Sequence, residues 1–200
     1  MKKLIVSFIA LLALSFAAGA QNPEKTWTIY SATGGANGLI SYNLFTSDSD
    51  AYSLAGIYEP YYENRSGSPV FCVGMEHLVG RWLALSVDLN WSILSAEAHD
   101  GVTHDYIGSC DAMSFCVMPG VKAYWTRHER YWIYSGLDMG VCGLLISEGE
   151  TSSFKPKFAM DFIPFGMSLR LVKDYDLYGF GEWMIGSRVL GGRLGIGIAF

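Results

Sequence analysis

The segment Ala96–Ser109 gathers two histidines and three carboxylates: Glu97, His99, Asp100, His104 and Asp105. Imidazole and carboxylate groups can bind a metal ion or exchange protons in acid–base catalysis. Their spacing matches no metal-binding motif, so solvated loop residues are the favoured interpretation and no metal is predicted. A serine beside a histidine can also act as nucleophile and base, which makes Ser95, His99 and His104 the catalytic candidates.

In several segments, large apolar residues alternate with small or polar ones. Seven other charged residues fall on the small or polar side of this alternation: Glu76, Asp88, Lys122, Asp138, Arg170, Glu182 and Arg193. If they share one interior, four acids and three bases must pair, because an unpaired buried charge is costly. A plug of salt bridges is the favoured interpretation, and a gated ion path or a proton-linked site is the alternative. Counting residues from the periplasmic end of each predicted strand places Arg193 at about the same height as Asp138 and Glu182. We therefore expect Arg193 to bridge these two carboxylates.

Four cysteines fall on the same small-residue side: Cys72, Cys110, Cys116 and Cys142. Cys116 and Cys142 flank the turn around His128 almost symmetrically, so we expect them on neighbouring strands. A disulfide between them is possible in an oxidising compartment. Two small unlinked side chains are the favoured alternative, because directly opposed strand residues lie a little far apart for disulfide geometry.

The composition limits the classes of protein that remain. Charged residues make up 16% of the 200-residue chain and hydrophobic residues 50%, whereas a soluble domain carries about 25% charged residues. The net charge of −5 argues against nucleic acid as a partner. No nucleotide-binding or haem motif is present, so no cofactor is predicted.

Residues 1–20 have the pattern of a secretory signal peptide. Lys2 and Lys3 precede an apolar run, and Ala18-Gly19-Ala20 forms a small-residue cleavage site, so cleavage is predicted after Ala20. The remaining domain, 21–200, contains no apolar run long enough for a transmembrane helix. We therefore expect either an exported soluble protein or a membrane barrel.

The mature chain alternates with a period of two, which is typical of strands. From Leu83 to Ile93, every second residue is apolar, and the residues between them are small or polar. With the apolar side inward, the outer surface would carry few charges, which suits a soluble protein poorly. With the apolar side outward, lipid meets the large residues and the small ones fill a narrow lumen.

Seven strands can be read directly: Val70–Val79, Trp82–Ser95, Cys110–Thr126, Tyr131–Ile146, Phe158–Lys173, Tyr175–Arg188 and Gly191–Phe200. Short turns alternate with longer loops at Ala96–Ser109 and Ser147–Lys157, as in outer-membrane barrels. If the last strand ends on the periplasmic side, where the short turns also lie, the strand at Val70 begins on the outer side and one more strand must precede it. Trp27–Thr33 is the candidate for that strand and Ala55–Tyr62 the competitor. The predicted fold is therefore all-β: a closed, antiparallel, eight-stranded transmembrane barrel, with 26–69 its least readable part.

Two further features bear on this barrel. Pro119 and Pro164 lie inside strands and lack a backbone donor, so each requires a bulge or a kink. Aromatic residues near the strand ends suit the girdles at the two membrane interfaces. These residues are Trp91, Trp125, Tyr131, Tyr175 and Phe200.

The chain resembles the small eight-stranded outer-membrane barrels of Gram-negative bacteria, the OmpX and OmpA transmembrane-domain type. The resemblance rests on the signal peptide, the alternating strands, the hairpin Pro119–Trp125 with Tyr134–Leu137, and the last strand with Leu194, Ile196, Ile198 and Phe200. It covers Val70–Phe200 well and the preceding region poorly. The resemblance implies that the terminal Phe200 is read by the barrel-assembly machinery, and that outer-membrane lipid and lipopolysaccharide surround the protein.

The members of that family have diverse roles, so the fold says little about activity. The favoured function is a structural or surface-interaction role in the outer membrane, with a lumen closed by the charged network. One alternative is a lipid-modifying enzyme with a rim site at Ser95, His99 and His104. The other is a soluble periplasmic ligand binder of lipocalin type. A large-solute porin is excluded, because such pores need about 16–18 strands.

Overall fold

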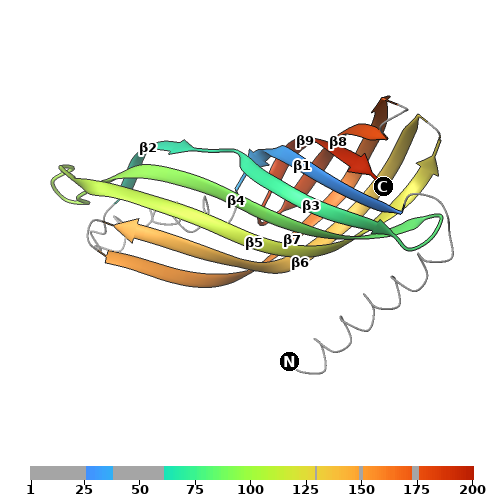
Figure 1. Ribbon diagram of the computed structural model, residues 1–200. Helices are drawn as coiled ribbons and strands as arrows, with labels where there is room; N and C mark the ends of the chain where they lie inside the picture. The colour runs from blue at the N-terminus through green and yellow to red at the C-terminus, as the bar shows by residue number, and fades with distance from the viewer. Residues whose placement is uncertain (1–25, 38–60, 129, 149–150, 173–175) are drawn as a thin grey trace, which may run out of the picture.

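The protein is described by a computed structural model that covers residues 26–37, 61–128, 130–148, 151–172 and 176–200. These ranges contain nine strands and no helix (Figure 1). The strands are β1 (Trp27–Ala36), β2 (Tyr61–Gly67), β3 (Val70–Leu78), β4 (Leu83–His99), β5 (Tyr106–Arg127), β6 (Tyr131–Glu148), β7 (Thr151–Val172), β8 (Leu177–Gly186) and β9 (Leu190–Ala199). The predicted signal peptide lies outside the described residues.

The barrel wall has eight positions although the described residues form nine strands, because β2 and β3 lie end to end along the same edge of β4 and share one position. Both pair with β4, and Ser68-Pro69 separates them. All pairings are antiparallel, β1 pairs with β3 and β9, and the β4–β5 pairing closes the barrel. This confirms the predicted fold class. The candidate Trp27–Thr33 falls within β1, whereas only the last two residues of the competing segment belong to β2.

Side chains alternate across the barrel wall as the period of two predicts. On β9, Arg193 and Ala199 are buried, whereas Leu194, Ile196 and Ile198 are largely exposed. The same apolar outer face covers the other strands, so the exposed surface suits lipid rather than water. A soluble lipocalin-type barrel would need these residues inside. Within the described ranges, no helix is long and apolar enough to cross a membrane.

The strands range in length from seven residues in β2 to 22 residues in β5 and β7. Strands β1, β3, β8 and β9 have nine or ten residues, which is what a tilted strand needs to cross a bilayer, about 9–11 residues. Strands β4 to β7 have 17 to 22 residues and extend well beyond the others (Figure 1). The molecule therefore has a membrane-length barrel and a protruding sheet.

The predicted long loops Ala96–Ser109 and Ser147–Lys157 are mostly strand, which corrects their assignment. Pairing between β4 and β5 continues to His99↔Tyr106, and pairing between β6 and β7 continues to Glu148↔Thr151. The pattern there is the reverse of that in the barrel: Ser95 and Glu97 face outward, whereas Leu94 and Ala96 face inward, as in a strand with one solvated face.

The two prolines behave differently. At Pro164 the β7–β8 register shifts between Phe162 and Phe165, which is the expected bulge. At Pro119 the ladder with β4 keeps its register, so the bulge or kink predicted there is absent. The bulge also reverses the facing of the residues before it. Ile163, predicted on the outer face, is therefore 0% exposed inside the barrel.

Candidate functional site in the barrel lumen

Six of the seven predicted lumen residues are buried inside the barrel. They are Glu76, Asp88, Lys122, Asp138, Glu182 and Arg193. The seventh, Arg170, lies at the rim and is partly exposed. Its guanidinium pairs with Asp176 at 2.9 Å and donates to the Tyr178 hydroxyl at 3.0 Å. Arg170 therefore belongs to a rim contact and not to the central network.

The lower part of the lumen is organised around Lys122 on β5. Its Nζ lies 3.0 Å from Glu76 Oε2 and 3.3 Å from Glu182 Oε1. The hydroxyl of Tyr124 donates to Glu76, and that of Tyr134 donates to Glu182 at 2.8 Å. One cation thus joins carboxylates from β3 and β8 across the barrel. Charge-assisted bonds of this kind satisfy groups that would otherwise be buried without water.

The middle of the lumen contains Arg193 from β9. Its Nε donates to Glu182 Oε2 at 2.7 Å, and its Nη1 donates to Asp88 Oδ2 at 2.7 Å and to Cys72 Sγ at 3.3 Å. The expected bridge to Glu182 is present. The expected bridge to Asp138 is replaced by the one to Asp88, because another arginine occupies the space beside Asp138.

That arginine is Arg188, which sequence reasoning did not place in the lumen. It follows the end of β8, in the turn before β9, and is 0% exposed. Its Nε pairs with Asp161, while its Nη1 and Nη2 lie 3.5 Å from Asp88 and Asp138. Asp161 Oδ1 also accepts the backbone N–H of Arg188 at 2.9 Å. The short outer turn is therefore held inside the barrel.

Asp161 was also missed, although the sequence contains a signal for it. The bulge expected at Pro164 reverses the facing of the preceding residues, which turns Asp161 inward, directly opposite Asp138 in the β6–β7 ladder. The described lumen then contains five carboxylates, Asp161 included, and three cations, Arg188 included. If all are ionised, the network carries two surplus negative charges. It can close the lumen, and it favours cations over anions.

Cys116 and Cys142 face each other in the β5–β6 ladder and form a disulfide, with a Cα–Cα distance of 4.0 Å. The disulfide was the possible pairing expected from the sequence, and the favoured interpretation of two unlinked side chains is wrong. Cys72 and Cys110 are buried and take no part in a disulfide. The disulfide lies above the charged network and ties two long strands together.

Replacing Cys116 and Cys142 by alanine is expected to destabilise the barrel. The disulfide closes a loop with a sequence separation of 26 residues, for which chain entropy gives about 3 kcal/mol. Chemical unfolding in detergent, followed by tryptophan fluorescence, measures the change. The C110A variant is the matched control, because Cys110 is a buried thiol on β5 that takes no part in a disulfide. Equal unfolding midpoints for the double variant and C110A would contradict the prediction.

The candidate catalytic residues lie on the protruding sheet and do not form a catalytic pair. Ser95 Oγ donates to Asp111 Oδ1 at 2.5 Å, and His99 Nδ1 lies 3.2 Å from the backbone oxygen of His104. Ser95 and His99 are four residues apart on one strand, which separates them by about 13 Å. A hydroxyl at that distance cannot transfer its proton to the imidazole, so this geometry does not support the enzyme alternative.

The same turn contains Asp100, whose carboxylate orders the backbone. Its Oδ1 accepts the N–H groups of Thr103 and Val102, both at 2.8 Å. These bonds hold the pKa of the Asp100 carboxyl below its usual range. Among the described residues, no group of three histidine, cysteine or acidic side chains is arranged to bind a metal ion.

The expected girdle residues lie on the outer surface where they are described. Trp91, Trp125, Tyr131 and Phe200 are exposed, and Tyr175 lies outside the described residues. Phe200 pairs with the other end of the chain: its N–H donates to the Trp27 carbonyl at 2.9 Å. Its role as an assembly signal remains a prediction.

The fold is that of the small eight-stranded outer-membrane barrels. The N-terminal barrel domain of Pseudomonas aeruginosa OprF aligns with a TM-score of 0.50 at 6% identity, over 88% of this chain and 98% of that one. Ail, the attachment invasion locus protein of Yersinia pestis, aligns at 11% identity with a TM-score of 0.41, over 87% of this chain and 95% of its own. No family model matches the sequence. No curated protein matches it.

Proposed function

We propose that this chain is an outer-membrane protein whose ion-paired lumen stays closed and whose protruding sheet binds partners at the cell surface. The apolar belt on the short strands supports the location, and the ion pairs that both buried arginines make with lumen carboxylates support closure. The observation that carries the binding role is an apolar face that continues beyond the membrane-length part of the barrel.

That face lies at the outer ends of β6 and β7. Counted from the inner ends of their strands, Leu145 and Phe154 lie 15 and 19 residues up, and the two residues are directly opposed in the β6–β7 ladder. A tilted strand leaves the bilayer after about 9–11 residues. Leu145 and Phe154 are nonetheless 40% and 63% exposed. Large apolar side chains gathered on a surface outside lipid mark an interaction site.

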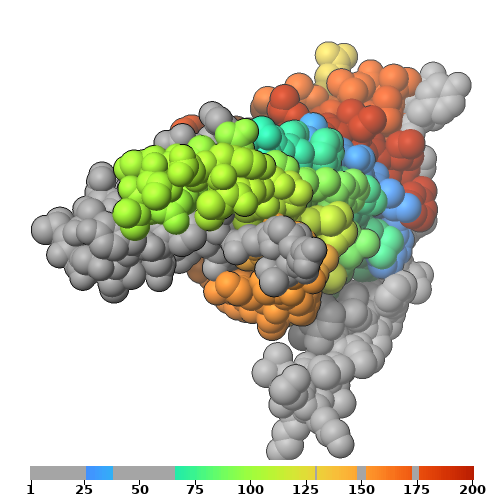
Figure 2. Space-filling model, turned by 90° about the vertical axis from the view of Figure 1, so that its left-hand side faces the viewer, coloured from blue at the N-terminus to red at the C-terminus, as the bar shows by residue number. Residues whose placement is uncertain are grey.

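The edge of this sheet is less suited to binding than its face. Among the described residues, no strand pairs with the outer edge of β7 between Thr151 and Ala159. Lys155-Pro156-Lys157 occupies the middle of that edge. Lysine and proline are the residues that keep an exposed edge from taking up another strand. We therefore assign binding to the apolar face described above, and not to the edge. Figure 2 looks onto this end of the molecule, with β4–β5 in lime and β7 in orange.

The test replaces Leu145 and Phe154 together by serine. Gram-negative cells that display the protein are expected to adhere to surfaces coated with extracellular protein, and cells with the double variant to lose that adhesion. V102S is the matched control, because Val102 is 59% exposed in the β4–β5 turn, outside the apolar face. A heat-dependent mobility shift on a detergent gel verifies folding. Equal adhesion by folded double variant and wild type would contradict the proposal.

A further inference from the structure

The barrel wall opens into a seam at its outer rim, between the end of β1 and the break between β2 and β3. The last β1–β3 pair is Gly34↔Val70. Gly34 and Gly35 have φ angles of 143° and 68°, which favour glycine, and the β1–β9 register shifts at this point. Beyond Val70, Pro69 has no backbone N–H with which to continue the pairing to β1. The chain on the other side of Pro69 is β2, which pairs with β4. The ends of β1 and β2 therefore lie unpaired with each other.

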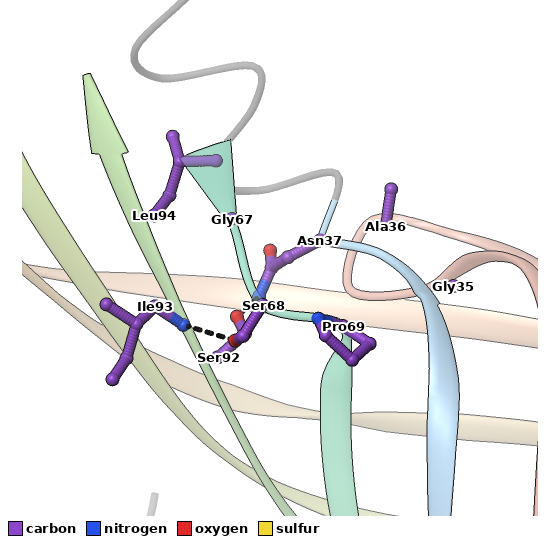
Figure 3. Close-up of a pocket in the computed structure, with 9 residues that line it drawn as sticks. All are labelled: Gly35, Ala36, Asn37, Gly67, Ser68, Pro69, Ser92, Ile93 and Leu94. Carbon is purple, nitrogen blue, oxygen red and sulfur yellow. Dashed lines mark hydrogen bonds between the residues drawn. The ribbon is translucent and has the colours of Figure 1, made fainter. Parts of the chain in front are cut away.

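A pocket of about 300 Å³ fills this seam (Figure 3). The wall beside it is close-packed at Gly67, where an added Cβ would lie 2.7 Å from Leu94 Cδ1. Ser68 fixes one wall, because its N–H donates to the Ile93 carbonyl at 2.9 Å and its Oγ accepts the Ile93 N–H at 3.0 Å. The wall is thus held by hydrogen bonds while the pocket between the strands remains.

The pocket has a polar inner wall and mainly apolar surroundings. Asn37 Nδ2 donates to Ser92 Oγ and to Ser114 Oγ, both at 2.7 Å, and these three side chains are buried. Ala36, Pro69 and Leu94 supply apolar surface. Mainly apolar lining with a few placed polar groups is the usual character of a small-molecule site, and the volume lies at the lower end of such sites.

The pocket adjoins the lipid-facing belt. Directly below it, Phe71 and Trp91 stack on the outer face with their ring centres 5.9 Å apart, and Ile93, which lines the pocket, is itself exposed on that face. Because the short strands end at this level, the seam lies where the acyl chains of the outer leaflet meet their head groups. A chain from that leaflet can reach the pocket without crossing water.

We propose that this seam binds the hydrocarbon end of an acyl chain from a lipid of the surrounding outer leaflet. The inference rests on the membrane location proposed above. The pocket is too small for a whole lipid and suits part of one chain, which packs against Pro69 and Leu94 and fills space that the missing β1–β2 pairing leaves open. Because the chain is already shielded from water in the bilayer, van der Waals packing against the pocket wall supplies the attraction.

The experiment uses the full mature chain in phosphatidylcholine vesicles that contain a small fraction of phospholipid with a diazirine at the end of one acyl chain. After irradiation, peptides with Gly67–Pro69 and Ile93–Leu94 are expected to carry more label than other lipid-facing peptides. G67L, which crowds the pocket by displacing the Leu94 side chain from its wall, is expected to lower that label to the belt level. V73L, on the outer face of β3, is the matched control and is expected to retain it.

Other outcomes are equally decisive. Uniform labelling of the belt in wild type would overturn the seam site while leaving the membrane location intact, because the belt label itself reports insertion. A chain that receives no label anywhere would instead contradict the proposed location. Labelling of the seam by a diazirine-bearing free fatty acid, but not by the phospholipid, would overturn the bilayer source. If G67L fails the heat-shift test for folding, L94W fills the same pocket from the other wall.

Discussion

Replacing Arg193 by methionine is expected to destabilise the folded barrel by about 3–5 kcal/mol, the cost of removing one partner of a buried ion pair. Arg193 is 0% exposed and its guanidinium contacts both Glu182 and Asp88. Methionine fills much of the volume but leaves both carboxylates without that cation. Lys122 remains 3.3 Å from Glu182 and Arg188 remains 3.5 Å from Asp88, so Asp88 exchanges its cation contact of 2.7 Å for a longer one.

Unfolding in urea, followed by tryptophan fluorescence in detergent, measures this loss. R170M is the matched control, because the Arg170–Asp176 pair at the rim is partly exposed and such pairs contribute about 0.2–1 kcal/mol. Adding D88N to R193M is expected to recover part of the loss, since the amide carries no charge. If R193M and R170M unfold at the same urea concentration, the buried network does not stabilise the barrel as argued.

Alternation alone was enough to predict the strands that cross the membrane and six buried lumen residues. A strand turns successive side chains to opposite faces, so residue numbers convert directly into facing wherever the register is unbroken. This holds from Leu83 to Ile93 on β4, and from Arg193 to Ala199 on β9. Large apolar residues on one face then identify the outside, because only lipid accepts such a surface.

The misses occur where that conversion fails. The bulge at Pro164 shifts the facing of the residues before it, so Ile163 and Asp161 turn inward. Arg188 lies in a turn, where no period predicts which way a side chain points. Arg170 has lumen parity but lies so near the rim that water and Asp176 reach it. The period of two predicts which face of the barrel wall a strand residue lies on. It does not predict how close that residue is to the rim, or which way a side chain in a turn points.

The protruding sheet was missed for a different reason. Above the membrane, β4 continues through Ser95, Glu97 and His99, which face outward as strand residues. The opposite face carries Leu94, Ala96 and Ala98, so the strand still alternates there, but with the polar residues outward instead of the large apolar ones. Outward residues of this kind are also typical of a solvated loop, and the pairing with β5 is a long-range property of the backbone.

Replacing Arg188 by glutamine is expected to let ions, and cations above all, through the barrel. Arg188 is the only one of the three described lumen cations that comes from a turn rather than a strand, and its contacts with Asp161, Asp88 and Asp138 hold that turn inside. Without its charge, three carboxylates lose their shared partner and the lumen changes from two to three surplus negative charges. Repulsion then widens the outer part of the plug.

Planar-bilayer recordings across a potassium chloride gradient measure both effects. The wild type is expected to stay closed, whereas R188Q is expected to conduct with a reversal potential shifted towards that of potassium. R188K is the matched control: it keeps the charge but has a single ammonium instead of the planar guanidinium that contacts three carboxylates. We expect R188K to conduct less than R188Q, because the charge balance of the lumen is preserved. Equal, unselective conductance in both variants would instead mean that packing, and not charge, keeps the lumen closed.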